Sequence, residues 1–201
     1  MTDPERLRAA LRETPRWEWV DTALTAAGER PETIGRSFVQ AGRRAGRTPL
    51  PGVPGWTADE AARALLLAAL PADRVETEIG DLYRFGDADE KRAVLKALPM
   101  LAVGAAGLPL LHDAIRTNDA RLLTAALGPY ARRLHQAAWR QAVLKCVFMA
   151  VPLTVVDGLD ERADRELAVM LAAFADERAA AGRSMPADAA DLLDRLTREE
   201  S

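Results

Sequence analysis

Cysteine and histidine are scarce in this chain of 201 residues, which contains one cysteine and two histidines. The single cysteine, Cys146, cannot form an internal disulfide, which fits a reducing compartment. Soft metal ligands are therefore few, and none has the spacing of a zinc site, so no metal site is predicted. A chain of this length buries about 70% of its unfolded surface, so its stability requires neither a disulfide nor a metal.

Aromatic residues make up only 5% of the chain, and β-branched runs are rare. The formal net charge is −3, and Arg43, Arg44 and Arg47 form only a short basic cluster, so nucleic acid is not an expected partner. The longest apolar runs, 97–111 and 146–156, contain proline and fall short of the ~20 residues that span a bilayer. The N-terminus mixes charges of both signs and lacks the apolar core of a signal peptide. We expect a cytoplasmic protein without membrane insertion.

Alanine, leucine and arginine dominate the composition, and helical periodicity occurs along nearly the whole chain. Helices are predicted near residues 3–13, 15–28, 31–45, 57–70, 72–85, 87–101, 106–117, 119–127, 129–151, 161–182 and 186–198. Short connections favour antiparallel neighbours, and segments 87–117 and 119–151 each have about the length of a HEAT-type unit. The predicted fold class is all-α, with antiparallel helical hairpins stacked as an irregular HEAT-like α-solenoid. A compact helical bundle is the alternative.

Several of these helices carry recognisable start signals. Thr57 and Glu60 match a capping box, in which a hydroxyl and a carboxylate satisfy each other's free backbone N–H groups. Asp87 and Glu90 imitate that arrangement, and Asp119 has the position of a cap for the next helix.

The segment GRTPLPGVPGW contains three prolines and three glycines, so it is predicted to be a loop. Leu50 and Trp56 are apolar anchors that a free linker would lack, which favours an ordered loop inside one domain over a linker between two domains. The predicted organisation is a single helical domain over 1–201, with an N-terminal subregion 1–45, the loop 46–56 and a main helical stack 57–201.

The stretch HQAAWRQAVLKC, residues 135–146, combines a histidine, a tryptophan, the only cysteine, an arginine and a lysine. On a helical wheel Trp139 and Cys146 share one apolar face, and His135 is predicted to lie on that face too. A cysteine in the middle of a helix among apolar residues is typical of structure, because a nucleophilic thiol needs a lowered pKa. Arg140 falls within the apolar surface, so it either extends along that surface or meets an acidic partner from a neighbouring helix.

Polar side chains are dense at the predicted helix ends between residues 83 and 145. Helix ends in a hairpin stack lie along one edge, so these groups either converge on one rim or pocket or form salt bridges between helices. The candidates for binding a ligand or partner are Arg84, Arg116, Asn118, Tyr130, Arg140, Gln141 and Lys145. The candidates for acid–base chemistry are Asp87, Asp119 and His135. We expect Arg84, Arg116 and Arg140 to lie near one another, close to Asp87 or Asp119.

Three long phrases in this region, roughly residues 82–153, resemble the EboA family of metabolite traffic proteins: LYRFGDADEKRAVLKALPML, LLHDAIRTNDARLLTAALGPYA and AWRQAVLKCVFMAVPL. The resemblance implies a bacterial protein encoded in an ebo-type gene cluster associated with a secondary-metabolite precursor. Other products of such clusters resemble a prenyltransferase-like membrane protein, a sugar-phosphate-cyclase-like enzyme and a TIM-barrel hydrolase-like protein. The resemblance supplies no catalytic residues.

The favoured function is a non-catalytic adaptor or small-molecule carrier in metabolite trafficking or biosynthesis. The expected partners are products of the same cluster or a metabolite, and contact with a membrane-protein partner stays open. The alternative is an enzyme that holds an anionic metabolite with the three arginines and uses Asp87, Asp119 or His135 as acid or base. Neither a Gly-rich phosphate loop nor a Gly-x-Ser-x-Gly elbow occurs, and no cofactor is predicted. A HEAT-type nucleic-acid binder is disfavoured by the net acidity.

Overall fold

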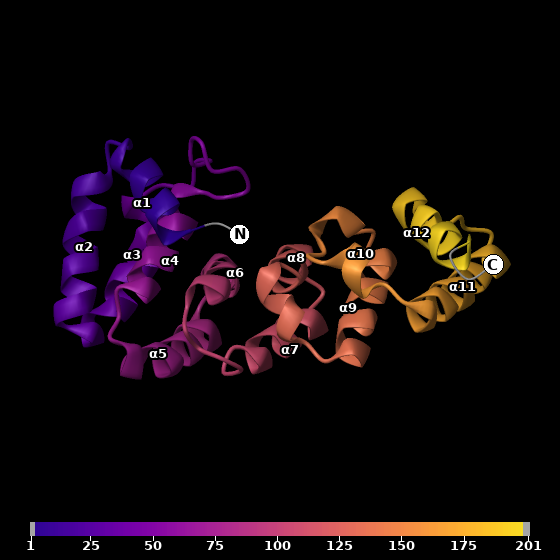
Figure 1. Ribbon diagram of the computed structural model, residues 1–201. Helices are drawn as coiled ribbons and strands as arrows, with labels where there is room; N and C mark the ends of the chain where they lie inside the picture. Colours follow the sequence, from indigo (N-terminus) through magenta and orange to yellow (C-terminus); the bar gives the residue numbers. More distant parts are fainter. Residues whose placement is uncertain (1–2, 199–201) are drawn as a thin grey trace. The chain divides into compact units, whose positions relative to one another are not determined.

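The computed structural model describes residues 3–198 and is all-α, as predicted (Figure 1). Within that range the chain forms no β-strand, only an isolated bridge between Pro49 and Thr57. The α-helices are α1 (Pro4–Arg12), α2 (Trp17–Glu29), α3 (Ile34–Arg44), α4 (Ala58–Ala68), α5 (Ala72–Phe85), α6 (Ala88–Ala97), α7 (Leu108–Arg116), α8 (Ala120–Ala126), α9 (Gln136–Phe148), α10 (Leu159–Arg162), α11 (Arg165–Ala180) and α12 (Ala187–Arg198). Short 3₁₀ helices are η1 (Pro31–Thr33), η2 (Leu98–Met100), η3 (Pro129–Arg133) and η4 (Leu153–Val155).

The chain forms two compact units, residues 1–113 and 114–201. The division between them falls within α7, so neither unit ends at a loop there. The predicted loop 46–56 lies inside the first unit.

Helix α4 is the centre of the first unit. It packs against α1, α2, α3, α5 and α6, and every residue from Ala58 to Leu67 is buried. Its many alanines allow neighbouring backbones to approach from all sides, which produces a bundle around one central helix. This local arrangement corresponds to the compact bundle considered as the alternative, and stacking of hairpins as a solenoid stays a prediction.

The connection between α3 and α4 is the longest within residues 3–198, and it is ordered. Leu50, Val53 and Trp56 are buried, and the backbone N–H of Leu50 donates to the carbonyl of Trp56 over 2.7 Å. Arg6 donates to the carbonyl of Gly52 over 2.8 Å, so α1 holds the tip of the loop. The apolar anchors therefore act as predicted.

The second unit packs its helices in chain order. Helix α9 lies against α8, η4 and α11, and α11 lies against α12. The core between them includes the fully buried side chains of Trp139, Val143, Cys146 and Leu171.

Both predicted capping boxes form. The Thr57 N–H donates to Glu60 Oε2 over 2.9 Å, and the Thr57 side chain accepts from the Glu60 N–H in return. At α6 the Glu90 N–H donates to Asp87 Oδ1 over 2.8 Å, and the Asp87 N–H donates to Glu90 Oε2 over 3.0 Å.

Two predicted long helices are wrong, because each is interrupted. The segment 129–151 divides into η3 and α9, with Leu134 extended, and α9 ends at Phe148. The segment 161–182 divides into α10 and α11, with Ala163 and Asp164 extended between them. Apolar periodicity continues across both breaks, which is why the sequence pattern concealed them.

His135 was predicted on the apolar face of a helix, and that placement is wrong. It is the exposed N-cap of α9, and its Nδ1 accepts a hydrogen bond from the Ala137 N–H over 3.3 Å. The break before it is stabilised by Arg162, which donates to the carbonyls of Ala131 and Leu134, each over 2.8 Å. The Ala131 carbonyl also accepts the Leu134 N–H over 2.9 Å, so Arg162 adds a second hydrogen bond at the end of η3.

Candidate functional site

The three acid–base candidates are all helix N-caps. Asp87 caps α6, Asp119 caps α8 and His135 caps α9, and each side chain accepts a backbone N–H at the start of its helix. The hydrogen bond from Arg121 is the main cause that lowers the pKa of Asp119 below its usual range. A carboxylate that remains ionised and satisfies a helix end is typical of a structural role.

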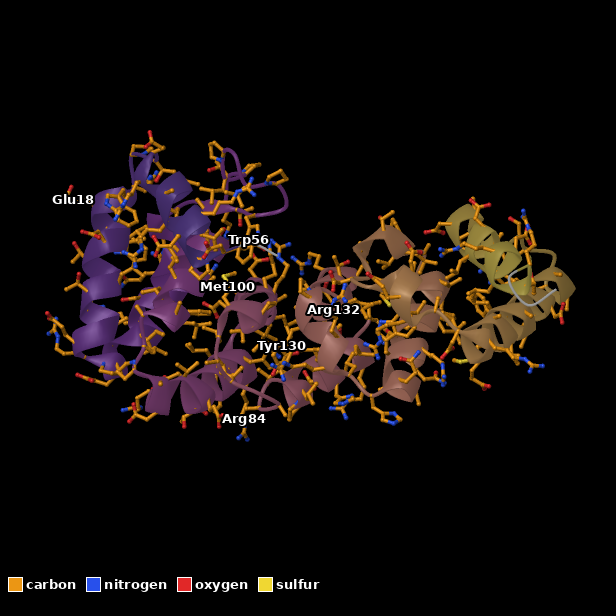
Figure 2. The ribbon with its side chains drawn as sticks, viewed as in Figure 1. Glu18, Trp56, Arg84, Met100, Tyr130 and Arg132 are labelled. Carbon is orange, nitrogen blue, oxygen red and sulfur yellow. The ribbon has the colours of Figure 1, made fainter. Side chains whose placement is uncertain are left out.

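The first predicted junction, between α5 and α6, is exposed. Arg84 lies in the last turn of α5 (Figure 2). Its guanidinium carbon is 5.3 Å from the centroid of the Phe85 ring. Phe85 is 76% exposed. Gly86 ends the helix, and a Cβ atom there would lie 2.5 Å from the Leu82 carbonyl oxygen, so the turn requires glycine.

The other candidates belong to the second unit. Arg116 and Asn118 are exposed at and after the end of α7, while Gln141 is exposed and Lys145 is half-buried on α9. Tyr130 is buried in η3, below the guanidinium of Arg133. Asp119 pairs with Arg121 over 2.8 Å. Arg84 belongs to the first unit and Arg116 and Arg140 to the second, so the proximity of the three arginines stays a prediction.

Arg140 meets an acidic partner from a neighbouring helix, one of the two alternatives that its position allowed. Its Nε donates to Asp164 Oδ1 over 2.8 Å and its Nη2 donates to Asp164 Oδ2 over 2.6 Å, a two-point contact. Asp164 is the N-cap of α11 and also accepts the Leu167 N–H. The hydrogen bonds from Arg140 are the main cause that lowers the pKa of Asp164 to about 2.

Two further side chains hold this ion pair in place. Gln136 Nε2 donates to Asp164 Oδ2 over 3.0 Å and to the Arg162 carbonyl over 2.7 Å. Arg162 Nη2 donates back to Gln136 Oε1 over 3.0 Å, and its guanidinium carbon lies 4.7 Å from the centroid of the Trp139 ring. The network fixes the orientation of Arg140, because Asp164 is held by Gln136 and Gln136 is held by Arg162.

Sequence analysis missed Asp164, Gln136 and Arg162 as parts of this network. Asp164 stood inside a predicted helix, where a carboxylate reads as a solvated side chain. An aspartate three residues before the buried Leu167 is, however, a usable start signal for α11.

An open hollow of about 500 Å³ lies beside the ion pair. Its lining residues come from α9 and the start of α11: Arg140, Asp164, Arg165, Glu166 and Val169. Val169 is 56% exposed, so the hollow combines two arginines and two carboxylates with an apolar wall. Such a surface can bind a group that accepts hydrogen bonds and also has an apolar part.

Cys146 lies away from this hollow, in the core of the second unit. It is fully buried on the apolar face with Trp139 and Val143, as predicted. Burial, and secondarily the Asp188 carboxylate, raise the pKa of the thiol to about 12. The thiol is therefore protonated at neutral pH and is not a nucleophile.

Fold and site together define an all-helical protein whose polar side chains cap helices and whose second unit carries an open, mixed-charge hollow lined by α9 and the start of α11. Residues 42–194, most of the chain, match the family described as "Metabolite traffic protein EboA", so the chain belongs to the EboA family. This match extends well beyond the three phrases that carry the resemblance. Comparisons with curated proteins and with solved structures found no match. Among residues 3–198 no helix is long and apolar enough to cross a bilayer.

Proposed function

We propose that this protein is a non-catalytic adaptor or small-molecule carrier in bacterial secondary-metabolite traffic. Membership of the EboA family supports a role in metabolite traffic. The capping role of Asp87, Asp119 and His135 is the observation that supports a non-catalytic mechanism. Asp119, whose pKa is lowered, is poorly suited to accept a proton from a substrate near neutral pH, and the side chains of Asp87 and His135 are engaged with helix ends.

The contact surface in this proposal is the hollow beside Arg140, together with the other predicted residues of the second unit, Arg116, Asn118, Tyr130, Gln141 and Lys145. Arg140 is held by Asp164, which Gln136 holds in turn, so a ligand or partner would meet a side chain that is already oriented. Arg84, beside the exposed Phe85, is proposed as a separate contact of the first unit.

The proposed partners are a small metabolite or other products of an ebo-type gene cluster, and a membrane protein among these products is included. We place the protein in the cytoplasm, where a single buried cysteine needs no protection from oxidation. No cofactor is part of the proposal.

The test is purification of the tagged protein from its native host, followed by mass spectrometry of bound small molecules and proteins. We expect wild-type protein to retain a specific compound or cluster product and Arg140→Gln to retain less of it. Arg195→Gln is the matched control, because Arg195 also pairs with a carboxylate of the same unit, Asp160, over 2.6 Å, away from the hollow. Equal retention by both variants would exclude the hollow as the contact surface. Conversion of the bound compound by purified wild-type protein would instead support the enzymatic alternative.

A further inference from the structure

We propose that a strip between α9 and α11 binds a small amphiphile, with its acidic head group in the hollow and its aromatic body along the two helices. This inference rests on the proposed function for the nature of the ligand, a small metabolite, and assigns that ligand a chemical class. The strip is defined by Arg140, Leu144 and Phe148 on α9 and by Met170 and Phe174 on α11.

Helical spacing places the α9 members of the strip on one side of their helix. Leu144 and Phe148 follow Arg140 at intervals of four residues, which correspond to one turn each. The interval of eight residues from Arg140 to Phe148 extends about 12 Å along the axis. On α11, Phe174 follows Met170 at the same interval, so these two side chains also share a side.

Two contacts bring the two helices together at the ends of the strip. Near the start of both helices Arg140 holds Asp164, the cap of α11. Further along, the rings of Phe148 and Phe174 meet edge to face, with centroids 6.5 Å apart and planes at 61°. The strip therefore begins at an ion pair and ends at an aromatic pair.

The apolar part of the strip faces solvent. Phe148 is 69% exposed, and Leu144, Met170 and Phe174 are each partly exposed. Val169, at 56% exposure, extends this surface toward the hollow. Large apolar side chains at this exposure mark binding surfaces when they are grouped, and methionine adapts to ligands of different shape.

The charged side chains that line the hollow determine that it binds the head group of an amphiphile and not its apolar body. Asp164 is already engaged by Arg140, Gln136 and the Leu167 N–H, so its acceptor capacity is used within the protein. Arg140 binds Asp164 through Nε and Nη2, which leaves its Nη1 N–H groups for a ligand. The lining also contains the exposed Glu166 carboxylate, so its formal charges balance, and the preference for a negative head rests on the Nη1 N–H groups of Arg140. A carboxylate or sulfonate head fits this end and an aromatic body fits the other, in a ligand about 12 Å long overall.

The probes for the test are 8-anilinonaphthalene-1-sulfonate and N-phenyl-1-naphthylamine, which share one aromatic body and differ only in the sulfonate. Fluorescence titration of wild-type protein should show saturable binding of the sulfonate probe and weaker binding of the neutral one. Phe148→Ser should weaken both probes about tenfold, as loss of a central aromatic contact does. Phe85→Ser is the matched control, because Phe85 is an exposed phenylalanine of the first unit. It should leave both affinities within about twofold of the wild-type values.

Variants at the hollow distinguish the contribution of the acidic head group to binding from that of the aromatic body. Arg140→Gln should weaken the sulfonate probe about tenfold, the effect of one lost charge-assisted hydrogen bond, and leave the neutral probe nearly unchanged. Because this change also removes the partner of Asp164, Arg165→Gln, at the same hollow, provides a second variant. Near-ultraviolet circular dichroism checks that each variant keeps its tertiary packing, since loosely packed states bind such probes nonspecifically.

Several outcomes would overturn the assignment. Unsaturable binding, or equal losses for Phe148→Ser and Phe85→Ser, would remove the strip as the site. A dimer that dissociates in Phe148→Ser, together with no probe binding, would show that a second copy covers the strip. Capture of a protein instead of a small compound by the wild type but not by Phe148→Ser would identify the strip as a protein interface.

Failure of this inference can be told apart from failure of the proposed function. If native-host purification yields a metabolite whose binding is unaffected by Phe148→Ser, the traffic role is supported and the strip is wrong. If probe binding depends on Phe148 and Arg140 but the host yields neither compound nor partner, the strip is an amphiphile site and the traffic role is wrong.

Discussion

Cys146 shows how burial decides the role of a single residue. Its side chain has no exposed surface, and the pKa of its thiol is raised to about 12. We expect Cys146→Ala to retain ligand and partner binding and to lower the free energy of unfolding by about 1 kcal/mol. Urea denaturation measures this loss. A thiol reagent at pH 8 should modify Cys146 only after unfolding, and loss of binding by a folded Cys146→Ala variant would contradict a structural role.

Asp164 makes part of the stability depend on pH. Its pKa falls from 3.8 to about 2 on folding, so the unfolded chain binds a proton more readily than the folded one. The stabilisation is present above about pH 4 and is lost as the pH falls toward about 2. It amounts to about 1 kcal/mol, because the partly exposed ion pair is screened by solvent.

The comparison is between wild-type protein and Asp164→Asn, which keeps a capping side chain but cannot ionise. Urea unfolding at several pH values should show that the wild type loses more stability than Asp164→Asn between about pH 4 and about pH 2. Asp160→Asn serves as the control, because Asp160 is an exposed carboxylate in an ion pair with Arg195. Parallel pH profiles for wild type and Asp164→Asn would contradict the linkage.

At the scale of elements, α4 is unusual because its charged residues are buried with its apolar ones. Arg63 is 1% exposed, pairs with Asp59 over 2.6 Å and donates to the Phe38 carbonyl over 3.0 Å. Glu60 is 2% exposed and contacts Lys96 and Arg92, each over 2.6 Å. The contact with Arg92 lacks the direction of a hydrogen bond, so it is an ion pair only. These pairs connect α4 to α3 and α6.

Removal of Arg63 should therefore be costly. Arg63→Met leaves the Asp59 carboxylate buried without its cationic partner, and we expect the free energy of unfolding to fall by about 3–5 kcal/mol. Arg74→Met is the matched control: Arg74 pairs with Glu78 at the same four-residue spacing, but its side chain is 43% exposed. That change should cost less than about 1 kcal/mol, and similar losses in the two variants would show that burial of the pair is unimportant.

Helix boundaries with local signals were predictable from the sequence, and those set by distant contacts were not. Both capping boxes depend on residues three apart, so Thr57 with Glu60 and Asp87 with Glu90 could be identified directly. The break before His135 depends on Arg162, 27 residues later, whose guanidinium donates to the carbonyls at the end of η3. No short-range pattern encodes such a contact.

The same limit applies to the candidate site. Arg140 was identified because it interrupts an apolar face, and an acidic partner was one of the two alternatives that followed. Which carboxylate it finds could not be predicted, because Asp164 lies 24 residues away and was hidden in a predicted helix. The burial of the charges of α4 had no signal in the sequence: Asp59, Glu60 and Arg63 lie on one side of the helix, a pattern that predicts an exposed polar face.

At the scale of the whole molecule, the prediction of a single domain means that both compact units should unfold together. The division between the two compact units falls within α7, so we expect one unfolding transition. Thermal unfolding followed by far-ultraviolet circular dichroism would be compared for Arg63→Met in the first unit and Leu171→Ala in the second. Each change should shift the entire transition. Two transitions, each shifted by only one variant, would establish two independent domains.

The capping role of the polar candidates has a consequence for how this sequence varies among relatives. Serine, threonine and asparagine cap helices about as well as aspartate, so position 119 should exchange freely among these residues. Position 164 should keep its carboxylate, because it both caps α11 and holds Arg140. Histidine is not among the preferred caps, so position 135 should drift toward asparagine or serine if capping is its whole role. A histidine retained there across distant relatives would instead be evidence of selection for the imidazole itself.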